Sequence, residues 1–278
     1  MNIDGNTELI AHLGWPTSAF KAPLIYNPYF ESVGVNVVVV PMGCKPDAFR
    51  EVLQSFFRLE NARGALVTMP HKVAVVDLLD EASAAVKVAG ACNAVKRLAD
   101  GRLIGDQFDG EGFVRGVRRN GLATAGARAL VVGCGGVGSA IAASLGGAGV
   151  HEVALFDVNK DSQHHLAKRL NSHYPKVRVA TGSNDPAGFD LVVNATALGM
   201  NRGDPYPVDV SRLEARTVVG DVVMSVETTA FLKAAGERGC RVQVGTDMLF
   251  EMIPPYLEFF GFPTTTVEQL RGLARIQY

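Results

Sequence analysis

The chain has 278 residues, which is long enough for two domains of ordinary size. Its 27 basic and 28 acidic side chains leave a net charge of −1, which argues against a nucleic-acid partner because such proteins carry a basic excess. No apolar run approaches the ~20 residues that a membrane helix needs, and the first residues lack the pattern of a signal peptide.

The cysteines are scattered along the chain, at Cys44, Cys92, Cys134 and Cys240. They form no Cys-x-x-Cys pair and have no histidine at ligand spacing, so we expect neither a disulfide framework nor a metal site. We expect a cytoplasmic protein whose partners are small molecules, with no role for nucleic acid or membrane. The oligomeric state stays open, with a homodimer among the options.

The first part of the chain alternates strand-like and helix-like segments. Apolar residues at 46–60 recur at helical spacing, and an Asp-Gly pair at 100–101 is typical of a tight hairpin turn. In chain order, the expected elements are strands at 36–42 and 65–69 with a helix at 46–60 between them, hairpin strands at 91–98 and 102–106, and a helix at 111–121.

The second part contains continuous apolar runs, which are typical of strands buried on both faces. The expected strands are 128–132, 151–157, 176–180, 190–196, 217–223 and 240–244, with helices at 139–149, 161–174 and 228–239. Strands that alternate with helices predict a parallel, doubly wound sheet, so the fold class is α/β. Two further helical segments, 248–261 and 267–278, could pack back on the first domain.

A glycine-rich loop follows the strand at 128–132 and opens a helix. Gly133, Gly135 and Gly138 form a G-x-G-x-x-G pattern, which also contains Gly136 and Val137. Glycines allow a tight turn and let the backbone approach a pyrophosphate, which the free N–H groups of the helix can bind. This context predicts a dinucleotide site; the alternative is a glycine-rich turn that binds nothing.

Asp157 ends the next strand, about 20 residues beyond the glycine loop, where dinucleotide-binding proteins place an acid on the ribose hydroxyls. A carboxylate repels a 2′-phosphate, and the following Val158 and Asn159 offer no arginine to bind one. We therefore predict NAD in preference to NADP. The alternative is that Asp157 only caps the next helix.

Five further motifs resemble those of the shikimate and quinate dehydrogenase family. They are ALVTMPHK, AGACNAV, LIGDQFDG, DLVVNATALGM and GTDMLFEM, in the family's order along the chain. The resemblance implies an α/β substrate-binding domain at 1–112, with the tail 252–278 packed back on it. It also implies a Rossmann-type, doubly wound NAD-binding domain at 113–251.

The resemblance also assigns roles to single residues. Lys72 and Asp109 match the catalytic pair beside the hydroxyl that is oxidised. A lysine screened from water can accept and return a proton near neutral pH, and a carboxylate nearby would orient it. Thr68 and Asn93 match substrate-binding positions. Four more positions are implied to border the cofactor: Thr196, Gly199, Gly245 and Met248.

The substrate positions depart from the family pattern. The family's S-x-S-P motif holds the substrate carboxylate with two serine hydroxyls, and here Phe20 and Ala22 stand in their place. A buried carboxylate that loses a donor becomes less favourable by ~1–3 kcal/mol. Further polar groups are lost at positions occupied by Leu66, Phe108, Met224 and, at a substrate position, Met252.

These observations predict an NAD-dependent oxidoreductase that interconverts a ring secondary alcohol and a ketone. The expected substrate is a shikimate- or quinate-related carbocycle other than shikimate. One alternative is a genuine quinate or shikimate dehydrogenase of relaxed specificity, and another is a non-catalytic NAD-binding sensor. A folate-linked dehydrogenase fits the N-A-T-x-L-G-M string less well. The substrate's identity and the direction of flux stay open.

Overall fold

The computed structural model describes residues 2–276, and these residues divide into two units. The first unit holds residues 2–87, 91–108 and 253–276, and the second holds 88–90 and 109–252. The second unit begins at Asp109, ahead of the predicted boundary after residue 112, because Asp109 begins a helix whose glycines pack within that unit. Residues 1, 277 and 278, which the predicted domain and tail include, lie outside the described residues.

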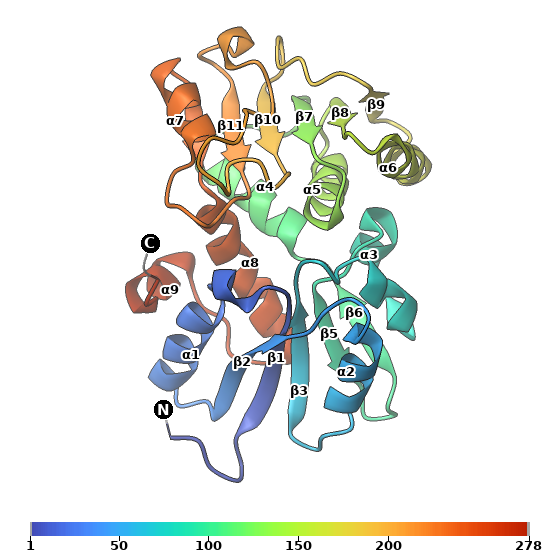
Figure 1. Cartoon of the computed structure of the whole chain (residues 1–278), viewed down its shortest axis with the longest axis vertical. Coiled ribbons are helices and arrows are strands. Elements are labelled where there is room, and N and C mark those ends of the chain that lie inside the picture. The colour runs from blue at the N-terminus through green and yellow to red at the C-terminus, as the bar shows by residue number, and fades with distance from the viewer. Residues whose placement is uncertain (1, 277–278) are drawn as a thin grey trace. The chain divides into compact units, whose positions relative to one another are not determined.

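The first unit is built on a six-stranded sheet of order β2-β1-β3-β5-β6-β4 (Figure 1). Its strands are β1 (Glu8–Gly14), β2 (Val37–Gly43), β3 (Ala62–Val67), β4 (Glu81–Ala82), β5 (Ala94–Arg97) and β6 (Leu103–Asp106). β1 runs parallel to both β2 and β3, whereas β5 is antiparallel to β3 and β6. The predicted hairpin therefore forms, as β5 and β6, with the turn at Gly101 in the left-handed region (φ 90°).

The helices of the first unit pack on both faces of this sheet. They are α1 (Pro23–Ser32), α2 (Phe49–Phe56), α9 (Val267–Leu273), the start of α3 (Ala84–Ala89) and the second half of α8 (Gly245–Phe260), besides 3-10 turns at Thr17–Ala19 and Ala74–Leu78. One core cluster joins Leu53 and Phe56 of α2 to Leu13, Val67 and Val95 of the sheet. Because successive side chains of a strand point to opposite faces, the neighbours of these sheet residues face the other way.

The second unit contains a six-stranded parallel sheet of order β12-β11-β10-β7-β8-β9. Its strands are β7 (Arg128–Val132), β8 (Glu152–Phe156), β9 (Arg178–Thr181), β10 (Leu191–Asn194), β11 (Val218–Asp221) and β12 (Arg241–Gln243). The order reverses between β7 and β10, and ligands of doubly wound sheets bind at the carboxyl ends of strands at this point. The α/β class and the Rossmann-type arrangement are therefore confirmed.

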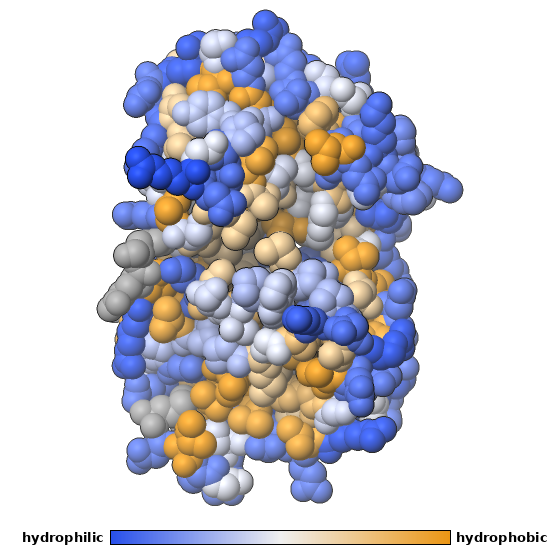
Figure 2. Space-filling view, in the orientation of Figure 1, coloured by the Kyte–Doolittle hydropathy of each residue, from blue (hydrophilic) through white to orange (hydrophobic). Residues whose placement is uncertain are grey.

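The helices of the second unit bury a continuous apolar core against this sheet. They are α4 (Asp109–Arg119), α5 (Gly136–Gly147), α6 (Lys160–His173), α7 (Ala230–Glu237) and the first half of α8. Val192 and Val219 of the sheet pack with Phe231 and Leu232 of α7. Figure 2 shows hydrophilic side chains over the outer side of α6, as expected for a helix with one face in water. Among residues 2–276, no helix is both long and apolar enough to cross a bilayer.

Candidate active site

The glycine loop joins β7 to α5, and the structure leaves no room for side chains at two of its positions. Gly133 has a φ of 103°, and a Cβ atom there would lie 2.6 Å from the carbonyl oxygen of Ala195. A Cβ atom at Gly138 would lie 1.9 Å from the carbonyl oxygen of Gly133. Gly133 and Gly138 are thus required for the turn itself and for the close packing of α5.

Gly135 has a different environment, which fits an anion. It is the N-cap of α5, and a Cβ atom there would meet nothing within 4 Å. No side chain caps the helix, and its first turn contains no acidic residue. The backbone at Gly135, Gly136 and Val137 therefore offers unshielded N–H groups at the positive end of a helix dipole. These residues fit the pyrophosphate of a dinucleotide.

Asp157 follows β8 and bonds to the glycine loop. Its Oδ2 accepts from the backbone N–H of Cys134 at 2.6 Å, and its Oδ1 accepts from that of Asn159 at 2.7 Å. The cap of α6 is Asn159, whose side chain accepts from the N–H groups of Asp161 and Ser162. The carboxylate of Asp157 therefore holds the loop next to it and does not serve as the helix cap.

A second loop, after β10, reaches the same end of the sheet. Asn194 Nδ2 donates to the carbonyl oxygen of Leu198 and to Asp221 Oδ1. The hydroxyl of Thr196 donates to Asn194 Oδ1 at 2.7 Å and accepts from Leu198 N. Gly199, with a φ of 98°, donates its N–H to Asp204. The polar side chains of this loop and the backbone N–H groups of Thr196, Leu198 and Gly199 thus hold the loop in its own shape.

Asp221 anchors this loop from the neighbouring strand. It also accepts from the backbone N–H of Val223 and from the hydroxyl of Thr229. Burial raises its pKa above the usual range, against the effect of these hydrogen bonds. Such a bonded, fully buried carboxyl holds the ends of β10 and β11 in a defined arrangement.

The start of α8 lies against the end of β11. A Cβ atom at Gly245 would lie 2.4 Å from the carbonyl oxygen of Val223 and 2.9 Å from Met224 Cγ. Met248, one turn later, is buried. Met252 is half-buried, and a Cβ atom built on Gly112 would lie 2.8 Å from the Cβ atom of Met252. The predicted cofactor positions of the second unit therefore gather around the carboxyl ends of β7, β10 and β11.

In the first unit, hydrogen bonds connect the segment of Lys72 to that of Asn93 and the segment of Asn93 to Phe108, which precedes Asp109. The N–H of Cys92 donates to the carbonyl oxygen of Lys72 at 2.7 Å, and the N–H of Phe108 donates to Asn93 Oδ1 at 3.0 Å. Asp109 follows Phe108 directly in the chain. Lys72, Asn93 and Asp109 are all buried. The ion pair between the side chains of Lys72 and Asp109 stays a prediction.

Asn93 keeps one polar group for a ligand. Its carbonyl oxygen accepts from the hydroxyl of Tyr256 at 3.2 Å, and its Oδ1 accepts from the N–H of Phe108. Its Nδ2 has no hydrogen-bond partner among the described residues, although the side chain is 1% exposed. A buried amide donor of this kind suits a substrate oxygen.

The two positions that lack serine lie next to buried aromatic side chains. Phe20 stacks on the ring of His12, with centroids 4.0 Å apart and an interplanar angle of 27°. Ala22 is buried and directly precedes α1. Thr68 is half-buried, and a Cβ atom at Gly14 would lie 2.4 Å from Thr68 Cγ2 and 2.9 Å from Phe20 Cζ. Phe20, His12 and Thr68 therefore belong to one region.

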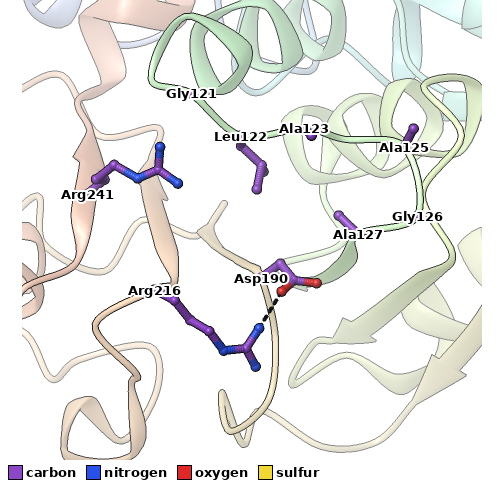
Figure 3. A pocket seen from close by; sticks show the side chains of 9 residues that line it. All are labelled: Gly121, Leu122, Ala123, Ala125, Gly126, Ala127, Asp190, Arg216 and Arg241. Carbon is purple, nitrogen blue, oxygen red and sulfur yellow. Dashed lines mark hydrogen bonds and ion pairs between the residues drawn. The ribbon is translucent and has the colours of Figure 1, made fainter.

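A hollow of about 360 Å³ lies at the other end of the sheet of the second unit (Figure 3). The 121–127 segment lines it together with Asp190, Arg216 and Arg241, which stand at or before the starts of strands. Arg216 Nη1 donates to Asp190 Oδ1 at 2.6 Å. Ligands of doubly wound sheets bind at the carboxyl ends of strands, so this hollow is not the active site. No group of three metal-ligating side chains occurs in the described part of the chain.

Comparison with known proteins identifies the family. Residues 13–95 match the family described as the shikimate dehydrogenase substrate binding domain. A shikimate dehydrogenase (NADP(+)) of Rubrobacter xylanophilus is 36% identical over 251 residues, which cover 89% of this chain and 88% of that protein. The chain belongs to the shikimate dehydrogenase family. It is thus an oxidoreductase that uses a nicotinamide cofactor to act on a CH–OH group.

Solved structures of family relatives agree over nearly the whole chain. A quinate dehydrogenase from Corynebacterium glutamicum in complex with NAD is 29% identical, with a TM-score of 0.84, and the match covers 96% of this chain and 98% of that one. A 5-ketofructose reductase of Gluconobacter sp. strain CHM43 is 25% identical, with a TM-score of 0.85 over 97% and 98% of the two chains. The family motifs recognised in the sequence therefore belong to a shared fold.

Sequence reasoning missed His12, a lone histidine in the apolar strand β1. It is 8% exposed, and its Nδ1 has no hydrogen-bond partner among residues 2–276. Burial, assisted by the positive charge of Lys72, lowers its pKa from 6.5 to about 3. The only signal in the sequence was a polar residue within an otherwise apolar strand, which is too weak to distinguish a ligand contact from core packing.

Gly138→Ala should abolish dinucleotide binding, because its methyl group would collide with the carbonyl oxygen of Gly133 and displace α5. Isothermal titration with NAD and NADP measures the loss. Gly236→Ala in α7 is the matched control, since a Cβ atom there meets nothing within 4 Å and alanine favours the helix. Retained affinity in Gly138→Ala would contradict this account of the loop.

The free energy of unfolding should fall as the pH decreases from about 6.5 toward 3, because the unfolded chain protonates His12 and the folded chain does not. One such proton corresponds to about 1.4 kcal/mol per pH unit within that window. His12→Phe keeps the stacked ring and should flatten the slope between pH 6.5 and 4.5, above the range where most carboxylates titrate. Urea unfolding of both proteins across this range tests it, and equal slopes would count against a neutral buried His12.

Proposed function

We propose that the chain catalyses the reversible, NAD-linked oxidation of a secondary alcohol to a ketone. The supporting observation is that Lys72, Asn93 and Asp109 are all present and buried. Hydrogen bonds connect the segment of Lys72 to that of Asn93, and Asn93 to the residue that precedes Asp109. Oxidation of an alcohol needs a hydride acceptor and a base, and the bound nicotinamide supplies the hydride chemistry. The protein must hold the carbon in position and move the proton.

Lys72 is proposed as the group that moves the proton. In oxidation its neutral amine takes the hydroxyl proton of the substrate, and in reduction its ammonium returns a proton to the carbonyl oxygen. Asp109 orients the lysine Nζ and the substrate hydroxyl by accepting hydrogen bonds from both. Asn93 Nδ2, which has no partner within the described chain, donates to a neighbouring substrate oxygen.

The cofactor is proposed to be NAD. Gly135, Gly136 and Val137 would hold its pyrophosphate, and Asp157 would accept hydrogen bonds from its adenosine ribose. The carboxylate of Asp157 opposes a 2′-phosphate, and the exposed Val158 beside it cannot bind one. The quinate dehydrogenase relative was solved with NAD, whereas the relative from Rubrobacter xylanophilus is named for NADP(+).

The substrate is proposed to be a shikimate- or quinate-related compound other than shikimate. The supporting observation is that Phe20 and Ala22 present no hydroxyl where the family binds a carboxylate, and Phe20 is fixed there by stacking on His12. Leu66 and Phe108 add apolar surface in the same unit. A structural relative is named for reduction of 5-ketofructose, an uncharged sugar, so the family fold also accepts substrates without a carboxylate.

The second candidate is a genuine quinate or shikimate dehydrogenase of relaxed specificity. The names of the relatives favour it, because those from Rubrobacter xylanophilus and Corynebacterium glutamicum are a shikimate and a quinate dehydrogenase. Steady-state assays with both acids and both cofactors separate the two candidates. Turnover of shikimate at the efficiency of a biosynthetic enzyme would favour the second candidate over the first.

Lys72→Met should lower kcat by about 10²–10⁴-fold, because the side chain keeps its length and loses its proton-accepting amine. The affinity for NAD, measured by titration, should not change, since the residue belongs to the first unit. The assay uses the alcohol that the wild-type protein oxidises fastest. Unchanged turnover in the variant would reject the catalytic role of Lys72, whereas NAD binding by a wild-type protein that oxidises no alcohol would favour the non-catalytic sensor.

Asp157→Asn combined with Val158→Arg should shift the preference from NAD to NADP by at least about tenfold in kcat/KM. Asparagine keeps an acceptor for the N–H of Cys134, so the glycine loop stays in place while the negative charge is removed. Val158→Arg alone is the control, because Asp157 would still repel the 2′-phosphate. A wild-type protein that already prefers NADP would refute the NAD assignment.

Phe20→Ser combined with Ala22→Ser should raise kcat/KM for shikimate by roughly tenfold or more, because each serine supplies a hydroxyl donor to the carboxylate. Ala19→Ser, at an exposed neighbouring position, is the matched control and should have no effect. Steady-state kinetics with shikimate measure the change. If the double variant gains nothing, the two positions do not decide recognition of the carboxylate.

A further inference from the structure

Each of the two positions that lack the family's serine lies beside a buried side chain with a polar atom that has no hydrogen-bond partner among the described residues. The first is His12, which stacks on Phe20 and is 8% exposed. Its Nδ1 has no hydrogen-bond partner in the described part of the chain. Phe20 also lies close to Thr68, a predicted substrate contact, because a Cβ atom built on Gly14 would meet both side chains.

The second is Tyr26, in the first turn of α1. Its backbone N–H donates to the carbonyl oxygen of Ala22 at 3.0 Å, so Tyr26 lies one helical turn after the second lost serine. Side chains four residues apart lie on the same face of a helix. Tyr26 is 1% exposed, and no residue among 2–276 bonds to its hydroxyl. Its neighbour Tyr29 differs, since its hydroxyl donates to the carbonyl oxygen of Pro263 at 2.6 Å.

Both groups are polar and uncharged. Burial depresses the pKa of His12 to about 3, so its imidazole is neutral at physiological pH, with one nitrogen able to accept and the other to donate. Burial raises the pKa of Tyr26 well above its usual range, so its phenol keeps its proton. Neither carries a positive charge that would favour a carboxylate over an uncharged group, and both can exchange hydrogen bonds with hydroxyl or carbonyl groups.

Buried polar atoms without partners are rare, because leaving them unpaired is unfavourable. We propose that His12 and Tyr26 together bind an uncharged hydroxyl, hydroxymethyl or carbonyl group at the end of the substrate where the family binds a carboxylate. This inference rests on the proposed function and specifies its substrate class: a polyhydroxylated secondary alcohol, or the matching ketone, without a carboxylate. His12 and Tyr26 are then specificity-determining residues, and Phe20 holds the imidazole in place.

The test compares substrates that differ only at that end. Shikimate and quinate are assayed with NAD beside their analogues in which a hydroxymethyl group replaces the carboxylate. The wild-type protein should favour the hydroxymethyl analogue in kcat/KM by roughly tenfold or more, the factor expected for one well-placed hydrogen bond. Preference for the carboxylates would overturn the inference.

Isosteric variants then assign the preference to the two residues. His12→Phe and Tyr26→Phe should each lower kcat/KM for the hydroxymethyl compounds by roughly tenfold and change the carboxylates little. Tyr29→Phe is the matched control on the same helix, and it should lower the melting temperature without changing the preference. Parallel losses on both substrate classes, or no loss, would show that the two side chains have a structural role only.

A thermal-shift measurement separates this inference from the proposed function. If none of the four compounds reduces NAD, the proposed reaction fails, yet recognition can still be measured. The hydroxymethyl compounds should then raise the melting temperature of the wild-type protein and of Tyr29→Phe, but not those of His12→Phe and Tyr26→Phe. Equal shifts in all four proteins, or none in the wild type, would reject the proposed recognition.

Discussion

The cofactor site depends on one close approach, between the first turn of α5 and the end of β7. The distance of 1.9 Å from a Cβ atom at Gly138 to the carbonyl oxygen of Gly133 means that no other residue fits without moving the helix. This approach directs the uncapped N-terminus of α5 at the carboxyl ends of the strands. Asp157 then reaches the N–H of Cys134, so this acid and the glycine loop hold each other in place.

The segments of the first unit that carry the proposed substrate-binding residues are held in place by a different set of contacts. The segments with Lys72, Asn93 and Phe108 are joined by hydrogen bonds of the backbone and of one amide, which do not depend on the substrate's far end. The residues proposed for that far end, Phe20 and Ala22, belong to the separate segment between β1 and α1. Because the two groups are held independently, the recognised group can change from one family member to another while the reacting groups persist.

The region around Phe20 and Ala22 illustrates how an apolar replacement changes the surroundings of residues beyond those replaced. The aromatic ring of Phe20 removes a donor and at the same time covers the imidazole of His12, which favours its neutral form through burial. Ala22 lies one helical turn before Tyr26, on the same face of α1. In the proposed site, neutral hydrogen-bonding groups therefore lie in the same unit as the apolar replacements.

The sequence by itself determined the elements and motifs whose signals are local. The individual strands and helices of the second unit, the β5–β6 hairpin at Asp100 and Gly101, and the glycine loop are each indicated by residues close together in the chain. The order and spacing of the motifs around Lys72, Asn93 and Asp109 were also sufficient to identify the family. The absence of hydroxyl groups at Phe20 and Ala22 was likewise evident from the sequence.

Only the tertiary structure decided which polar atoms have partners. The hydroxyl of Thr196 bonds to Asn194 and Leu198, and Asp157 bonds to Cys134, whereas the Nδ1 of His12 and the hydroxyl of Tyr26 bond to no described residue. A sequence pattern names donors and acceptors but cannot pair them, because each pairing depends on how distant segments pack within hydrogen-bond distance and exclude water.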